Sequence, residues 1–153
     1  MVNKRTIQWN CRGYSANYEE IRTLISEKQP YCLCLQETYH GTNTPAAPRG
    51  YTPISAAAVV PIIPGTRPSR GVVTLVRNNV PHYNIALNTT LEAVAVRLWM
   101  SRDYTICNIY PRSGEGVVGV GAIMCSHKMT SAMLLATYLS SHLGSLPLEW
   151  PGG

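Results

Sequence analysis

The stretch that decides the fold is residues 7–13, Ile-Gln-Trp-Asn-Cys-Arg-Gly, together with residues 32–38, Cys-Leu-Cys-Leu-Gln-Glu-Thr. Each begins as a mainly apolar strand and ends in a hard oxygen-bearing side chain, Asn10 in the first and Glu37 in the second. If the strands are parallel neighbours, roughly 4.8 Å apart, both side chains emerge at the carboxyl edge of the sheet, where open α/β sheets bind ligands. The strand ends are therefore a candidate Mg²⁺ and phosphate site. The alternative is an ordinary α/β domain in which both residues only cap loops.

The segment between these strands is predicted to form a helix. Asn17 is expected to cap it, with Glu20 at the third helical position completing a capping box. The apolar residues that follow keep helical spacing, namely Ile21, Leu24 and Ile25, and Pro30 ends the helix. The unit is therefore β-α-β, whose crossover makes the two strands parallel.

Downstream of residue 38 the chain changes in character. Six prolines between residues 41 and 70 argue against helix and predict a surface loop, with a short edge strand within residues 51–60. Strand patterns follow over residues 72–77, 83–87, 93–100 and 104–110. The short connection at residues 101–103 predicts that the strands at residues 93–100 and 104–110 form a hairpin. Short turns between consecutive strands predict an antiparallel sheet, as in a two-sheet α/β sandwich.

The segment after Ser113 has a different composition, so we divide the chain at residues 1–113 and 114–153. Residues 114–121 are rich in glycine, and a helix is predicted over residues 129–143. Residues 114–119 also match the G-x-G-x-x-G pattern of dinucleotide-binding folds. Three residues separate this string from the preceding strand, and neither an adjoining helix nor the expected acid follows it. A glycine-rich linker is the favoured interpretation.

Composition narrows the class of protein. The chain has 153 residues, a length typical of one domain, and a net charge of +5 that suits a polyanion such as DNA. Five cysteines, an odd number, argue against a disulfide framework. Cys32 and Cys34 are expected to be buried hydrophobes, because a zinc site with His40 would be short of ligands. Apolar runs are too short for a membrane span, so we expect a soluble, intracellular protein with no membrane partner.

The motifs at residues 7–13 and 33–38 resemble the exonuclease-endonuclease-phosphatase superfamily, in particular the apurinic-endonuclease-like domain of jockey-type non-LTR retrotransposons. Other segments match in the same order. Residues 70–77 resemble the arginine-glycine strand of the family, residues 91–98 the next strand, and residues 104–110 the strand that ends in its active-site tyrosine, Tyr110. The resemblance covers about residues 4–113. It implies the amino-terminal part of a two-sheet, four-layer α/β sandwich.

The resemblance also implies that Asn10, Glu37 and Tyr110 are catalytic residues, and that Glu37 and Asn10 hold Mg²⁺, with Mn²⁺ as a substitute. In such enzymes the metal binds the scissile phosphate while an aspartate activates water. The family further requires a Gly-Asp-x-Asn segment and a terminal Asp-His pair. This sequence has one aspartate, Asp103, without an asparagine two residues later, and its two Ser-His steps lack the aspartate. The general base and the phosphate-binding histidine are missing, so we expect no activity.

The sequence therefore predicts a remnant of a retrotransposon-encoded, Mg²⁺-dependent DNA endonuclease. Intact relatives nick DNA so that a linked reverse transcriptase can prime from the new end, which makes DNA and that transcriptase the expected partners and the nucleus the expected location. Residues 114–153 are interpreted as the product of a truncation or a frame change. Sugar-phosphate and lipid phosphodiesterases share the same first strands. The prediction of DNA as the substrate therefore depends on the retroelement-like motifs and the basic charge. The alternative is a non-catalytic basic fragment that binds nucleic acid or has no specific function.

Overall fold

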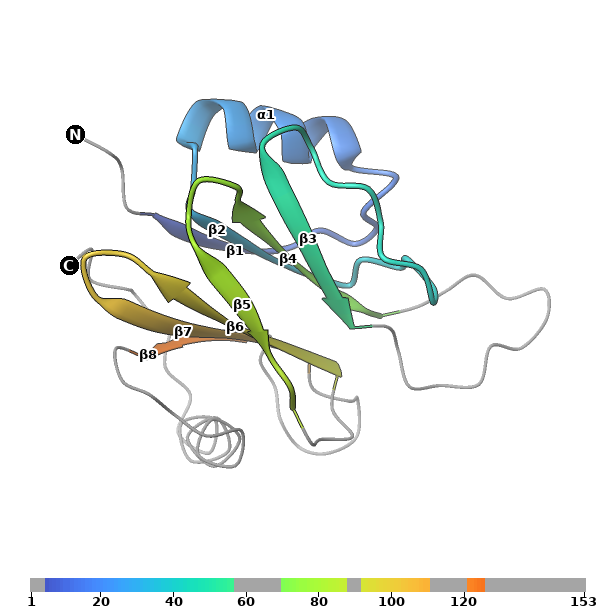
Figure 1. Cartoon of the computed structure of the whole chain (residues 1–153). Coiled ribbons are helices and arrows are strands. Elements are labelled where there is room, and N and C mark those ends of the chain that lie inside the picture. The colour runs from blue at the N-terminus through green and yellow to red at the C-terminus, as the bar shows by residue number, and fades with distance from the viewer. Residues whose placement is uncertain (1–4, 57–69, 88–91, 111–120, 126–153) are drawn as a thin grey trace.

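The computed structural model describes residues 5–56, 70–87 and 92–110, and the backbone of residues 121–125. The elements in chain order are β1 (Thr6–Asn10), α1 (Tyr18–Lys28), β2 (Cys32–Gln36), β3 (Tyr51–Ala56), β4 (Val72–Arg77), β5 (His82–Ile85), β6 (Glu92–Trp99), β7 (Asp103–Tyr110) and β8 (Gly121–Cys125). They form two four-stranded sheets, ordered β1-β2-β4-β3 and β5-β6-β7-β8. The helix covers one face of the first sheet and the second sheet packs on the other (Figure 1). This arrangement confirms the predicted α/β sandwich class.

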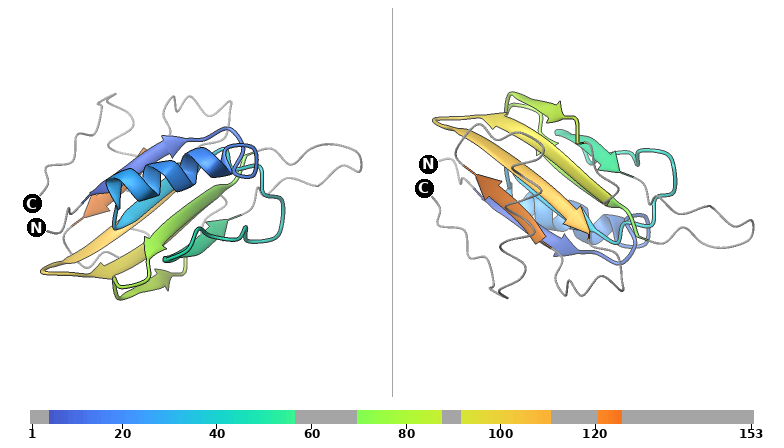
Figure 2. Two further views of the ribbon diagram at one scale, coloured as in Figure 1. Left: turned by 90° about the horizontal axis from the view of Figure 1, so that it is seen from above. Right: turned by 90° about the horizontal axis from the view of Figure 1, so that it is seen from below.

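The first sheet contains the predicted β-α-β unit. β1 and β2 are parallel neighbours, and Asn10 is in register with Gln36. β4 lies between β2 and β3 and is antiparallel to both. The sequence predicted this strand in one antiparallel sheet with the strands that follow it, and this prediction is wrong. β4 is buried on both faces, because α1 covers the first sheet on one side and the second sheet packs on the other (Figure 2).

The edge strand expected within residues 51–60 is present as β3, at the edge of the first sheet. It contains Pro53, which an edge position tolerates because proline has no N–H to donate. In the second sheet, β6 and β7 form the predicted hairpin. β8, which was not predicted, pairs with β7 in antiparallel orientation. The predicted helix at residues 129–143 and the glycine string at residues 114–119 lie outside the described residues, and the boundary at residue 113 stays a prediction.

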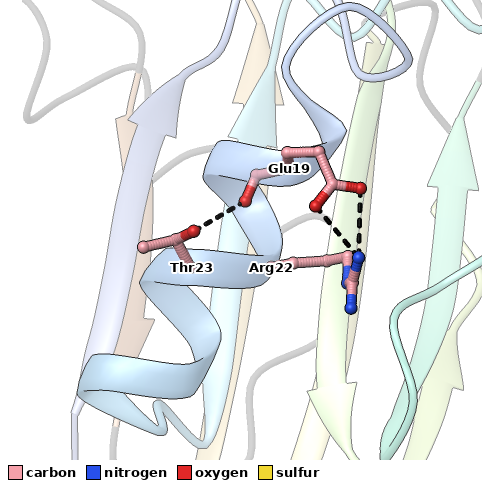
Figure 3. Close-up of polar contacts among 3 residues, drawn as sticks. All are labelled: Glu19, Arg22 and Thr23. Carbon is pink, nitrogen blue, oxygen red and sulfur yellow. Dashed lines mark hydrogen bonds and ion pairs between the residues drawn. The ribbon is translucent and has the colours of Figure 1, made fainter.

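The helix is amphipathic in the way the spacing predicted. Its buried side chains, Ile21 and Ile25, pack on the apolar residues of β2 and β4, namely Leu33, Leu35, Val73 and Leu75. On its solvent face Arg22 pairs with the Glu19 carboxylate at 2.9 Å, and the Thr23 hydroxyl donates to the Glu19 carbonyl (Figure 3). Such exposed ion pairs contribute only about 0.3–0.5 kcal/mol, so the helix is held mainly by its apolar face.

Asn17 occupies the predicted cap position, but the predicted capping box does not form. The Asn17 side chain makes no hydrogen bond to the first turn of the helix. Its Nδ2 instead donates to the carbonyls of Cys11, at 2.7 Å, and Gly13, at 3.2 Å. The loop after β1 brings these carbonyls within reach, so the amide is used to tie the start of the helix to the strand end that carries Asn10.

The core between the sheets includes Cys32 and Cys34, both fully buried, as predicted. Among the residues that the structure describes, no group of three or more His, Cys, Asp or Glu side chains could hold a metal. No helix in the described part of the chain is long and apolar enough to cross a membrane.

Candidate functional site

Three loops meet at the carboxyl edge of β1 and β2. One follows β1, one follows β2 and one precedes β4. Backbone hydrogen bonds join them at four points: Gly13 N to Glu37 O at 2.7 Å, Tyr14 N to Thr38 O at 2.8 Å, Tyr39 N to Arg70 O at 2.8 Å and Thr38 N to Gly71 O at 3.2 Å. The loop after β2 is therefore held between the other two, and the side chains of all three emerge at one place.

The backbone at this edge is strained. Among the described residues, five other than glycine have positive φ angles, and four of these lie in the three loops, namely Arg12, Glu37, Tyr39 and Arg70. Each such conformation costs roughly 1–3 kcal/mol and persists only where the surroundings impose it. The left-handed turn at Glu37 breaks the alternation of β2 and changes the direction of its side chain. Strain concentrated in this way is typical of binding and catalytic sites.

Glu37 is the centre of the site. The Tyr110 hydroxyl donates to Oε1 at 2.9 Å, and the Tyr39 hydroxyl donates to Oε2 at 3.1 Å. The Asn10 side chain lies beside the carboxylate, where it acts to lower the pKa of Glu37. The structure thus brings together all three residues that the sequence singled out, with Asn10 from β1, Glu37 from the end of β2 and Tyr110 from the second sheet.

The charges at the site favour an ionised Glu37. Partial burial acts to raise the pKa of this carboxyl, but the hydrogen bonds from Asn10, Tyr110 and Tyr39, together with the nearby Arg12 guanidinium, outweigh it, and the pKa is lowered. Burial and then the bond to Glu37 raise the pKa of Tyr110. The carboxylate is therefore charged at neutral pH, and the phenol that holds it stays protonated.

Glu92 and Arg70 are parts of the site that the sequence did not predict. Glu92 is the first residue of β6, lies opposite Tyr110 in the register of β6 with β7, and is almost completely buried. Its Oε2 accepts the Gly71 N–H at 3.0 Å, and the Arg70 guanidinium lies 3.9 Å from its Oε1. Glu92 thus ties the loop before β4 to the second sheet beside Tyr110. The only sign of Glu92 in the sequence was a single carboxylate at the start of an apolar strand.

The arginine-glycine step has a steric explanation. Gly71 has a φ of +92°, and a Cβ there would lie 2.9 Å from both the His40 ring and the Thr38 hydroxyl. These two side chains also contact each other, with His40 Nδ1 2.6 Å from Thr38 Oγ1. Burial lowers the pKa of His40. A side chain at residue 71 would displace this pair and with it the loop that carries Glu37.

Asp103 lies outside the site. Its carboxylate pairs with Arg97, with Oδ2 3.0 Å from Nη2. It is at the opposite end of β7 from Tyr110, about 23 Å away along an extended strand of that length. The one aspartate of the chain therefore has a structural partner and no access to Glu37.

The residues at the site fit a magnesium ion. Asn10 Oδ1 is buried and has no hydrogen-bond partner among the described residues, while the Glu37 carboxylate is ionised beside it. Mg²⁺ is usually held by one or two carboxylates, other oxygens and several waters, often together with a phosphate. Asn10 and Glu37 are of the right chemistry to be its protein ligands.

Comparison with known protein families agrees with the geometry. Residues 7–148 match the endonuclease/exonuclease/phosphatase family, so the match includes both sheets and extends past residue 113. A search of curated proteins gives no significant match. The matched residues include every side chain of the Glu37 site, and the chain belongs to the endonuclease/exonuclease/phosphatase family.

Proposed function

We propose that this chain is a remnant of a retrotransposon-encoded DNA endonuclease that still binds Mg²⁺ and a phosphodiester but does not hydrolyse it. The observation that carries the proposal is the convergence of Asn10, Tyr110 and an ionised Glu37 from three strands. The buried and unpaired Asn10 Oδ1 supports a cation at this point. Family membership supports a nuclease or phosphatase type of site.

Each retained residue has a role in binding. Glu37 and Asn10 would hold the cation, and Tyr110 keeps the carboxylate in place through its hydrogen bond to Oε1. Bound Mg²⁺ would supply charge stabilisation for the phosphoryl oxygens. Arg12, exposed beside Glu37, is placed to attract the negatively charged backbone of a nucleic acid.

Among the described residues, none is placed beside Glu37 to act as the general base or as the phosphate-binding histidine. Asp103 is paired with Arg97 at the far end of β7. His40, the described histidine nearest to Glu37 in sequence, has its Nδ1 against Thr38 and its Nε2 buried. Loss of a general base and of a phosphate-binding histidine lowers catalysis by several powers of ten. We therefore expect binding without cleavage.

The choice of DNA, and of a retroelement as source, rests on the motifs and on charge. The segments around Asn10 and Glu37 have sequence motifs like those of retroelements, and the net charge of +5 favours binding of a polyanion. A linked reverse transcriptase, a nuclear location and an origin of residues 114–153 by truncation or frame change are parts of the same proposal.

The test is binding of a fluorescent duplex DNA to the full chain, with Mg²⁺ or with EDTA. We expect Mg²⁺ to tighten binding, and Glu37→Gln to abolish that effect. Glu27→Gln, an exposed glutamate on α1, is the matched control and should behave as wild type. Competition with inositol phosphates and with phospholipid vesicles separates DNA from other phosphate esters. Binding that ignores both Mg²⁺ and Glu37 would instead favour a non-catalytic basic fragment.

Inactivity is tested with supercoiled plasmid and Mg²⁺ or Mn²⁺. We expect no nicking above background. Nicking that disappears in Glu37→Ala would show that the chain is an active nuclease and would overturn this part of the proposal.

A further inference from the structure

A fully buried amide network joins the two sheets directly beneath the Glu37 site. Gln36 Nε2 donates to Asn108 Oδ1 at 2.7 Å. Asn108 Nδ2 in turn lies 3.2 Å from three acceptors of the first sheet, the Leu35 and Val73 carbonyls and the Thr74 hydroxyl. Carbonyl oxygens only accept, so the nitrogen of Asn108 must face them and its oxygen must face Gln36. The orientation of the Gln36 amide follows, with Nε2 toward Asn108 and Oε1 pointing elsewhere.

Asn10 lies beside the Glu37 carboxylate, and its side chain is one of the causes that lower the pKa of that carboxyl. Two amide oxygens, Asn10 Oδ1 and Gln36 Oε1, are buried without a hydrogen-bond partner among the described residues. Buried acceptors without a donor are destabilising and rare, so each of these two oxygens needs an explanation.

The two oxygens belong to adjacent positions on one face of the sheet. Asn10 and Gln36 are register partners on parallel strands, so their side chains leave the same face, about 5 Å apart at the backbone. The direction is toward the second sheet, where Gln36 contacts Asn108. Glu37 follows Gln36 directly, and its carboxylate is within reach of Asn10. Two buried amide oxygens and one carboxylate therefore belong to neighbouring positions at the carboxyl ends of β1 and β2.

We propose that Gln36 is a positioning residue of the cation site, whose Oε1 accepts a hydrogen bond from a water carried by the divalent cation on Glu37 and Asn10. The inference rests on the proposed function, because it presupposes that cation. Mg²⁺ and Mn²⁺ keep several waters in protein sites, and such waters donate to nearby oxygens. Gln36 thereby connects the hydrated cation to the Asn108 network and, through β7, to Tyr110.

The test measures Mn²⁺ binding to the full chain by electron paramagnetic resonance. Gln36→Met removes both polar atoms with little change in size, and Thr74→Val is the matched control because it removes a polar atom from the far side of the same network. Outer-shell residues typically change metal affinity tenfold to a hundredfold, so we expect a loss of about that size in Gln36→Met. Thr74→Val should stay within about twofold of wild type, because Gln36 remains in place.

A second variant covers the case in which Gln36→Met does not fold. Gln36→Glu keeps an acceptor at the position of Oε1 and adds negative charge near the cation, so Mn²⁺ should bind about fivefold tighter or more. Unchanged Mn²⁺ affinity in Gln36→Glu, or in a folded Gln36→Met, would overturn the role of Gln36. If Glu37→Gln binds Mn²⁺ as well as wild type, the cation site itself is wrong. If only Glu37→Gln loses binding, the proposed function stands and this inference fails.

Discussion

Replacement of Asn108 by alanine tests how much of the fold depends on one buried amide. Asn108 is fully buried; its Oδ1 accepts from Gln36, and the two N–H groups of its Nδ2 are shared among three acceptors on β2 and β4. Alanine leaves the Gln36 amide without an acceptor, at a cost of about 1–3 kcal/mol, and each other lost bond costs about 0.5–1.5 kcal/mol. Allowing for partial relaxation, we expect the free energy of unfolding to fall by about 3–5 kcal/mol, a large part of the stability of a small domain.

The measurement is urea denaturation of the full chain, followed by tryptophan fluorescence. Asn84→Ala is the matched control, since Asn84 is exposed on the edge strand β5, and it should change the free energy of unfolding by no more than about 0.5 kcal/mol. A decrease of under about 1 kcal/mol for Asn108→Ala would refute the reasoning, because it would mean that water or neighbouring groups replace the network at little cost.

Three further outcomes follow from the pKa directions and from the strand order. The folded-state pKa of Glu37 is lowered, so the ionised carboxylate stabilises the fold above about pH 4.5. This stabilisation is lost as the pH falls through the folded-state pKa. The free energy of unfolding should therefore decrease more steeply with acid in wild type than in Glu37→Gln. The pKa of His40 is also lowered, so the free energy of unfolding should decrease as the pH falls below about 6.5. His40→Gln should remove this pH dependence. If the free energy of unfolding of wild type and variant depends on pH in the same way, the assignment is contradicted. A chain that ends at residue 113 lacks β8 and exposes the edge of β7, so urea denaturation and gel filtration should show lower stability and more aggregation, whereas an unchanged midpoint would show that β8 adds nothing.

The parts of the fold that the sequence predicts are those set by local pattern. Apolar strands at residues 7–10 and 32–36 with one helix between them require a parallel crossover, and that alone brings Asn10 and Glu37 to one edge. The hairpin of β6 and β7 follows from its short turn in the same way. Tyr110 could be placed only through the family resemblance, because it lies in the other sheet and no local rule relates the two.

The rest depends on contacts between distant segments. The position of β4 in the first sheet follows from burial of both its faces, which a single sequence does not reveal. Asn17 fits a helix cap by composition, yet the carbonyls of a nearby loop compete successfully for its amide. Tyr39 has a left-handed backbone that no local sequence pattern predicts. Glu92 has only the weak signal of a carboxylate at the start of an apolar strand, and its role depends on a contact between the sheets.

The residues around Glu37 also take part in the contact between the two sheets. Tyr110 reaches Glu37 from the second sheet, and Asn108, two residues earlier on β7, is anchored to β2 and β4. Glu92 fastens the loop before β4 to the same sheet. Changes at Glu37 or Tyr110 would therefore disturb contacts that hold the two sheets together. The geometry at Glu37 is therefore maintained by the contact between the two sheets, and it does not depend on hydrolysis being carried out there.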